Sequence, residues 1–380
     1  MSAPAHAVPG RTGDGAALRH VLGHLLTPLL MCVGMGIAYL GAFHAPAPHD
    51  LRVDVVGPGP SAQVLAQTLQ DKGAGALNVR TVPDREAAVG QLMDQAVYGA
   101  YVPGKGEGAP ELLVATASSE TSATAVQKVF TEVAAKHGEP LKVTDVTPTA
   151  SGDPTGQGLF FLLVALSIGS YASVAVIGGA GGVLPMRIRT LLAAGMSLVV
   201  SGIGAVFAGP MFHLVDRGLG GLWAMSWVYS AGILLIGVGL HTFLKRWTTL
   251  GVMVLFVMLN FTSSGGIFRP ELQSGFFGAL HAFWNGAGFI EGARSHVYFD
   301  GNGLGRHVLV LGLWLVAGLA AMGAAGLAEA RRRRAAVAGA PGVTAGAAAG
   351  ATAGEVAGEA SESGAAAAEE EEEMEEAVGV

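Results

Sequence analysis

Six long stretches of the chain contain no Asp, Glu, Lys or Arg, and each is long enough to form a helix that crosses a membrane. The hydrocarbon core of a bilayer requires about 20 apolar residues in a helix. Lipid offers no partner to an unpaired backbone group, so a spanning segment must be a helix rather than an open strand. The stretches are residues 20–49, 154–186, 190–215, 218–244, 247–268 and 307–328. The sequence therefore predicts an α-helical polytopic membrane protein with six transmembrane helices.

The composition supports this class and excludes others. Only 13% of the residues are charged, whereas soluble domains carry about 25%. The net charge is −7 and no basic stripe runs through a predicted folded segment, which argues against a nucleic-acid partner. The single cysteine, Cys32, excludes an intrachain disulfide. We therefore expect the lipid bilayer to be the main partner.

The first apolar stretch is interpreted as an anchor that stays on the protein. Its apolar run is about twice as long as that of a signal peptide, and Tyr39 and Phe43 stand where small residues would mark a cleavage site. Residues 20–49 are therefore assigned to the first span and a short stalk.

The orientation follows from Lys and Arg, which are enriched in cytoplasmic loops. Four basic clusters fall on one side of a six-span chain: Arg11 with Arg19, Arg187 with Arg189, Lys245 with Arg246, and Arg331 to Arg334. This pattern places residues 1–19 and the C-terminus in the cytoplasm. It places residues 50–153 and 267–306 outside, and it predicts a multi-pass protein of the cell (plasma) membrane.

Residues 50–153 form the one sizeable water-soluble segment, and strand and helix patterns alternate along it. Strands are predicted at 53–56, 78–82, 96–102, 111–117 and 141–146. A helix is predicted to run from Ser61, as its capping residue, to about Lys72. Two more helices are predicted, one from Asp84 onward with Ala87, Val89 and Leu92 toward a core, and one over 119–137. We therefore expect a small extracellular α/β domain.

Residues 154–330 are assigned to a five-span membrane domain that contains one unusual outer segment, 267–306. That segment is too apolar for a plain loop, because five large apolar side chains share one helical face: Phe276, Phe277, Leu280, Phe283 and Trp284. We expect a helix that lies in or dips into the outer leaflet. Gly286 and Gly288 are predicted to break it before a second short helix that carries Glu291 and Arg294.

Residues 331–380 begin with a basic stop and continue with Ala, Gly, Ser and Glu. Such a composition cannot bury enough apolar surface to offset the entropy of ordering, so we expect a disordered acidic cytoplasmic tail. The acidic run from Glu369 to Glu376 is interpreted as a solvated tail or as a docking segment for a basic partner.

No motif for catalysis, nucleotide binding or a cofactor is evident in the sequence. There is no phosphate-binding loop and no nucleophile elbow, and His44 and His49 beside Asp50 lack further metal ligands nearby. The six stretches also lack the carboxylate that proton-driven transport usually requires. The chain is therefore not expected to be an enzyme, to bind a cofactor or to couple protons.

Glu291 and Arg294 are spaced to pair on one helical face. One interpretation is a weak interfacial ion pair. The other is that the two side chains line the outer mouth of a transport pathway.

The chain resembles type-2 ABC exporter permeases, and especially their phage-infection-protein-like branch. Its arrangement is similar to theirs: one span, an ectodomain, five spans, and an amphipathic outer segment before the last span. Three local patterns carry the resemblance: PDREAAVGQLMDQAVYGAYVPG (83–104), NFTSSGGIFRPELQSGFFGALHAF (260–283) and GARSHVYFDG (292–301). The similarity covers roughly residues 20–330.

The resemblance implies a permease subunit that forms a dimer and moves an amphiphilic or polymeric cargo, with ATP hydrolysed by a separate cytoplasmic subunit. The basic loops would then dock the ATPase through Arg187, Arg189, Lys245 and Arg246, although these residues also fit simple positive-inside anchoring. Glycines in the spans permit close helix packing, either within the bundle or at a homodimer seam. The alternative function is a six-span surface receptor or membrane-assembly factor that uses its ectodomain as a binding module.

Overall fold

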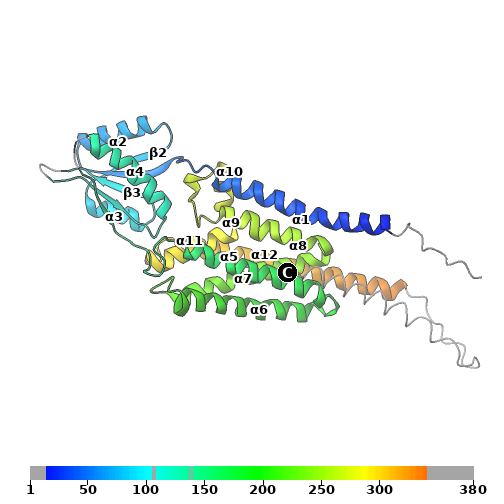
Figure 1. The fold of residues 1–380 in the computed structure, drawn as a ribbon. Coiled ribbons are helices and arrows are strands. Elements are labelled where there is room, and N and C mark those ends of the chain that lie inside the picture. Colours follow the sequence, from blue (N-terminus) through cyan, green and yellow to red (C-terminus); the bar gives the residue numbers. More distant parts are fainter. Residues whose placement is uncertain (1–13, 105–107, 137, 139, 340–380) are drawn as a thin grey trace, which may run out of the picture. The chain divides into compact units, whose positions relative to one another are not determined.

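The computed structural model describes residues 14–104, 108–136, 138 and 140–339, and Figure 1 shows their fold. Within these residues, five helices are long and apolar enough to cross a membrane. They are α1 (Asp14–Phe43), α5 (Gly158–Gly178), α6 (Met186–Val206, extended by the π-helix η2, Phe207–Met211), α7 (Leu219–Leu244) and α12 (Leu304–Gly339). The chain is thus consistent with a multi-pass membrane protein.

The remaining predicted span, 247–268, forms a shorter and interrupted helix. It consists of α8 (Thr248–Met253), the π-helix η4 (Val254–Met258) and α9 (Leu259–Ser263). The helix ends at Ser263, and Gly265 follows with a φ of 72°, a conformation that suits glycine. The segment is shorter than the 20 or so residues of a standard span, so the prediction of six spans is not confirmed.

The water-soluble segment folds into the predicted α/β domain. Its strands are β1 (Leu51–Val56), β2 (Leu77–Val82), β3 (Gly99–Val102), β4 (Glu111–Val114) and β5 (Lys142–Asp145). They form one sheet in the order β2-β1-β3-β4-β5. Only the β3–β4 pair is antiparallel, with Ala100 opposite Leu113. All five predicted strands are therefore present.

Helices cover both faces of this sheet. Helices α2 (Pro60–Gly73) and α4 (Glu120–Lys136) share one buried apolar cluster with alternate residues of β1, whereas α3 (Arg85–Met93) packs in a second cluster with Ala100 and Leu113. Asp84 caps α3 as predicted, by accepting a hydrogen bond from Ala87 N. Two details of the prediction are wrong, because Gly59 rather than Ser61 precedes α2, and because Ala88 rather than Ala87 is buried.

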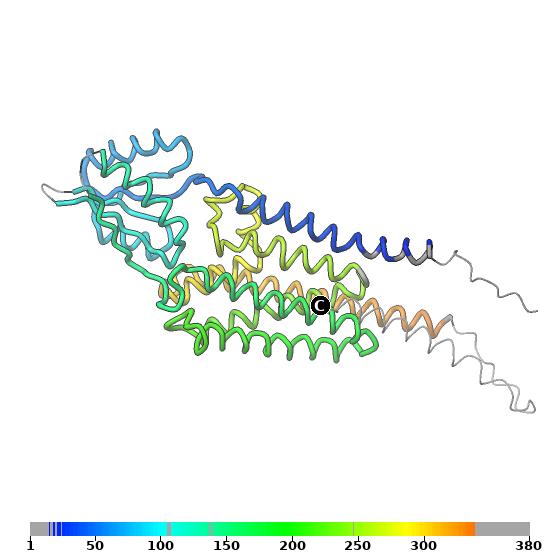
Figure 2. The backbone as a smooth tube through the Cα atoms, viewed as in Figure 1, coloured from blue at the N-terminus to red at the C-terminus, as the bar shows by residue number. Residues whose placement is uncertain are grey.

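The sheet domain is inserted in the chain between α1 and α5, as the tube in Figure 2 shows. The helices have two ends. The end next to the sheet domain, where α1 ends and α5 begins, is called the sheet end; the opposite end is called the distal end. The apolar cluster under α3 continues into the core of the helices.

Glycines of α7 allow close packing between the helices. A Cβ on Gly237 would lie 2.5 Å from Val174 Cγ2 of α5, and one on Gly239 would lie 2.8 Å from the Ala321 carbonyl carbon of α12.

The predicted amphipathic segment folds into two helices of different character. The short helix α10 (Gly275–His281) leaves Phe276 exposed, and Phe283 after it is also exposed. The next helix, α11 (Asn285–Tyr298), is buried along almost its whole length and packs against α5, α7 and α9. It runs through Gly286 and Gly288, so the predicted break at these glycines is wrong; the interruption comes earlier, at residues 282–284.

The chain divides into two compact units, Met1–Arg331 and Arg332–Val380. Helix α12 continues through the four arginines of the predicted stop. The predicted disordered tail after residue 339 lies outside the described residues, as does the N-terminal segment before residue 14.

Candidate functional site: a buried charge network at the sheet end

Helix α11 begins in the middle of the bundle and ends at its sheet end. At its start, Asn285 Nδ2 lies 3.4 Å from the carbonyl oxygen of Tyr229, ten residues into α7 and therefore about 15 Å along that helix. At its end, the hydroxyl of Tyr298 donates to Leu214 O at 3.3 Å in the loop between η2 and α7. In Figure 1 this helix lies among the spans rather than beside them. A half-length helix therefore enters the bundle from the sheet end.

The central group of the site is the carboxylate of Glu291 on α11. Arg269 Nη1 donates to Glu291 Oε2 at 2.5 Å, and Arg294 Nη1 donates to Glu291 Oε1 at 2.9 Å. All three side chains are buried. Arg294 also donates to the carbonyl oxygens of Gly265 and Gly266, just after α9. The site thus joins α11 to the end of the interrupted helix.

The network extends into the sheet domain through Tyr98, which directly precedes β3. The Tyr98 hydroxyl accepts a hydrogen bond from Arg269 Nε at 3.1 Å and donates to Glu271 Oε2 at 2.7 Å. Arg52 of β1 donates to the other oxygen of Glu271 at 3.1 Å. A continuous chain of hydrogen bonds therefore links β1 of the sheet domain to Glu291 inside the bundle.

The surroundings keep this network charged at neutral pH. The guanidinium groups of Arg269 and Arg294 stabilise the ionised form of Glu291, because each donates a hydrogen bond to one of its two oxygens. His281 of α10 lies beside the same carboxylate, with Nε2 4.0 Å from Glu291 Oε1. Its Nδ1 hydrogen-bonds to Ser263 O at 2.9 Å. Glu291 is therefore ionised between two guanidinium groups, with an imidazole beside it.

A neutral polar cluster surrounds the buried start of α11. The Tyr229 hydroxyl lies 2.5 Å from Ser167 Oγ and accepts from Asn260 Nδ2 at 2.6 Å. Asn260 Oδ1 in turn accepts from Gly286 N at 2.7 Å, which satisfies a free donor in the first turn of α11. These bonds hold α11 to α5, α7 and α9 in the interior of the bundle.

The structure brings together only part of the predicted site. Glu291 and Arg294 form the predicted pair, and both side chains are buried within the protein. Whether the pair lines a pathway stays a prediction. Of the predicted docking residues, the three whose side chains the structure describes, Arg187, Arg189 and Lys245, do not join this network.

The predicted docking residues lie near the distal end and differ from one another. Arg187 and Lys245 are exposed. Arg189 is buried in an ion pair with Glu329 of α12, and Thr242 also hydrogen-bonds to that carboxylate. The Arg246 side chain lies outside the described residues. Arg189 therefore has a partner within the chain.

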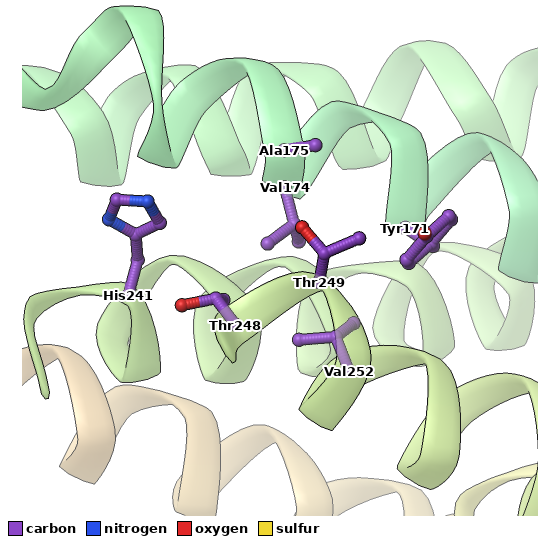
Figure 3. A pocket seen from close by; sticks show the side chains of 7 residues that line it. All are labelled: Tyr171, Val174, Ala175, His241, Thr248, Thr249 and Val252. Atoms are coloured by element: carbon purple, nitrogen blue, oxygen red, sulfur yellow. The ribbon is translucent and has the colours of Figure 1, made fainter. Parts of the chain in front are cut away.

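A small pocket lies near the distal end between α5, α7 and α8 (Figure 3). Polar groups of Tyr171, His241, Thr248 and Thr249 line it together with Val252 and two further residues of α5. Its volume is about 30 Å³, which is room for one or two water molecules. It is too small for a cargo molecule.

The sequence pattern missed the residues that connect the network. Arg269 and Glu271 flank Pro270 in a segment that otherwise consists of apolar and small residues. Two opposite charges in such a segment could have indicated that they take part in a buried ion pair. Tyr98 gave no signal, because it is one aromatic residue in a predicted strand. Glu329 stands one residue beyond the charge-free stretch 307–328, although it lies within the apolar helix.

No protein-family model matches the chain, and no curated protein and no solved structure matches it either. Among the described residues, no group of three or more His, Cys, Asp or Glu is placed to hold a metal ion.

Proposed function

We propose that the chain is an integral membrane permease subunit similar to those of type-2 ABC exporters, which moves an amphiphilic or polymeric cargo with energy from a separate ATPase. The observation that carries the proposal is α11, a half-length helix that holds Glu291 and Arg294 inside the bundle. Ionised groups inside a membrane bundle are costly, and they mark substrate or ion pathways in transport proteins. Half-helices that end at membrane depth are likewise a recurrent element of transport sites.

The network also gives the sheet domain a mechanical connection to that helix. Arg52 and Tyr98 belong to the sheet domain, and both bond to Glu271. Tyr98 also bonds to Arg269, which in turn bonds to Glu291. A movement of the sheet domain can therefore be transmitted through these bonds to Glu291. This connection supports a transport role, since a simple binding module would require no ion pair inside the bundle.

The proposal includes a topology. The two termini face the cytoplasm, the sheet domain lies outside the cell membrane, and the interrupted helix α8–η4–α9 supplies a sixth crossing together with α10 and α11. Two single-cysteine variants test this topology: Lys128→Cys on α4 and Arg334→Cys on α12, each in a Cys32→Ser background. Both side chains are exposed. An impermeant thiol reagent added to intact cells should label the cysteine at 128 and spare that at 334; the reverse pattern would overturn the topology.

The proposed docking of a separate ATPase is tested with residues at the distal end. Arg187 and Lys245 are the exposed basic residues of the predicted docking loops, whereas Arg189 is committed to Glu329. The double variant Arg187→Gln/Lys245→Gln should therefore lose an ATP-hydrolysing partner without a change in melting temperature. Arg306→Gln, an exposed basic residue at the sheet end, is the matched control.

The readout is the ATPase activity that co-purifies with tagged protein from native membranes. We expect stoichiometric activity with the wild type and the Arg306→Gln control, and a loss of at least tenfold with the double variant. If no ATPase accompanies the wild-type chain and proteoliposomes of the chain alone show proton-driven flux, the permease-subunit proposal is wrong. If no ATPase accompanies it, there is no flux, and the sheet domain captures a ligand, the receptor or assembly-factor alternative is favoured.

A further inference from the structure

A second pocket lies at the sheet end, where the sheet domain meets the loop between η2 and α7 and the end of α11. Its volume is about 400 Å³, within the range of pockets that bind small ligands. Met93, Val146, Pro148 and Val297 give it apolar walls. No motif in the sequence marks this pocket, because its lining comes from four separate segments.

Hydrogen bonds fix the walls of this pocket. Arg217 Nε donates to Val297 O at 2.6 Å, which holds the η2–α7 loop on the last turn of α11. Asn302 Nδ2 donates to Asp94 Oδ1 at 3.1 Å and to Met93 O at 3.3 Å, which holds the end of α3 beside the same turn. The pocket is therefore preformed.

The polar side of the pocket carries an excess of negative charge. Arg217 forms an ion pair with Asp300 at 3.3 Å, but its side chain is still 61% exposed and can bind a further anion. Asp216 also lines the pocket and is exposed, and among the described residues it makes no hydrogen bond or ion pair. The carbonyl end of α11 adds partial negative charge. An occupant with a cation for Asp216 and an anion for Arg217 would match both groups.

The pocket also lies beside the ends of three apolar helices, which is where lipid headgroups would meet helices that cross a membrane. The apolar spans of α6–η2, α7 and α12 end or begin at Met211, Leu219 and Leu304 around it. Met211 and Phe212, which lead into the lining loop, are exposed apolar side chains. A lipid could therefore place its headgroup in the pocket and its acyl chains along these residues.

We propose that this pocket binds the headgroup of phosphatidylethanolamine, with the primary ammonium on the carboxylate of Asp216 and the phosphate on the guanidinium of Arg217. The ammonium has N–H donors for Asp216, whereas the trimethylammonium of phosphatidylcholine has none. The anionic headgroup of phosphatidylglycerol offers no cation. The site is independent of the proposed transport function, because headgroups line both surfaces of a membrane.

The test uses the purified full-length chain in detergent micelles with equimolar phosphatidylethanolamine, phosphatidylcholine and phosphatidylglycerol, and native mass spectrometry to measure each bound lipid. We expect the wild type to retain phosphatidylethanolamine about fivefold more than either other lipid, as for a partly exposed ion pair. Asp216→Asn should abolish this preference. Asp71→Asn, on α2 and outside the pocket, should keep it.

Two further arms keep the result interpretable. Pro148→Trp places a large side chain at an exposed position of the wall and should lower retention of all three lipids without changing the melting temperature. Glycerophosphoethanolamine, a soluble form of the same headgroup, should displace the lipid only at large excess. Equal retention of the three lipids by the wild type, an unchanged preference in Asp216→Asn, or displacement by equimolar glycerophosphoethanolamine would each overturn the proposal.

Discussion

Glu291 in the bundle and Glu111 in the sheet domain are both carboxylates held between two cations. Glu111, on β4, pairs with Arg85 at 3.1 Å and Lys142 at 3.4 Å, and it also accepts from Thr144 Oγ1 at 2.6 Å. The pKa of Glu111 is lowered to about 2, first by the Thr144 hydroxyl and then by Arg85. Glu291 is held between two guanidinium groups, Arg269 at 2.5 Å and Arg294 at 2.9 Å.

The cations around the two carboxylates differ in their access to water. Arg85 and Lys142 are 51% and 69% exposed, whereas Arg269 and Arg294 are 8% and 4% exposed. If Glu111 is lost, water solvates its partners. If Glu291 is lost, two guanidinium groups remain in a site that water scarcely reaches. Two carboxylates that each lie between two cations should therefore contribute very differently to stability, because only the partners of Glu111 are solvated.

The largest effect is expected for Glu291→Gln. Breaking a buried ion pair by removing one partner costs about 3–5 kcal/mol, because the remaining charge is not compensated. Thermal unfolding of the purified full-length chain should show this loss, and the variant should assemble poorly in the membrane. Glu86→Gln, at an exposed position in the first turn of α3, is the control and should be neutral. A loss below about 1 kcal/mol for Glu291→Gln would contradict the comparison.

An intermediate effect is expected for Arg189→Gln at the distal end. The Arg189 guanidinium is buried, but its partner Glu329 is 19% exposed and also contacts Thr242. Water therefore solvates part of the charge that remains, and we expect a loss of about 1–3 kcal/mol by the same unfolding measurement. Arg187→Gln, two residues away and exposed, is the matched control. Equal losses for the two arginines would show that burial of Arg189 does not matter.

A smaller effect is expected for Tyr98→Phe, which keeps the ring and removes only the hydroxyl. Arg269 keeps its bond to Glu291 and Glu271 keeps Arg52, so the loss should be about 1–2 kcal/mol. A double-mutant cycle with Glu271→Gln measures the coupling of the two side chains. Additive losses in that cycle would argue that the hydroxyl does not connect the sheet domain to the network.

The smallest effect is expected for Glu111→Gln, about 0–1 kcal/mol at pH 7, because water screens the exposed cations Arg85 and Lys142 and because the Gln carbonyl still accepts from Thr144 Oγ1. Its folded-state pKa of about 2 lies below the unfolded value of about 4.3. The ionised carboxylate therefore stabilises the fold above about pH 4.3, and this contribution is lost as the pH falls toward 2. Melting temperatures of wild type and variant should converge over that window. A difference that persists at pH 2 would show that the effect is not electrostatic.

The sequence predicted the sheet domain well, because local patterns determine its elements. Short apolar runs separated by turn residues correspond to all five strands, and Asp84 is a side-chain cap that can be recognised without tertiary information. The sheet order could not be predicted in this way, since no residue of β3 or β4 specifies its neighbour. The register depends on packing with α2, α3 and α4.

The bundle was predicted less completely, because charge-free length does not distinguish a full span from a broken one. Residues 248–263 contain no charge, yet π-helix η4 and the turn at Gly265 shorten the helix. Glu291 and Arg294 were correctly paired by their spacing. Their burial depends on Arg269 and on the sheet domain, which no local pattern can indicate.

The burial of α11 has a consequence for the order in which the protein is made. This helix has 14 residues, too few for a stable span, and each of its charges costs about 2.5–3.5 kcal/mol when a lone helix inserts. It cannot therefore partition into lipid by itself as it leaves the ribosome. Its charges need their partners: Arg269, in the segment before α10, and Tyr98, in the sheet domain. We expect α11 to enter the bundle as a late step of maturation, after the sheet domain has folded and positioned Tyr98.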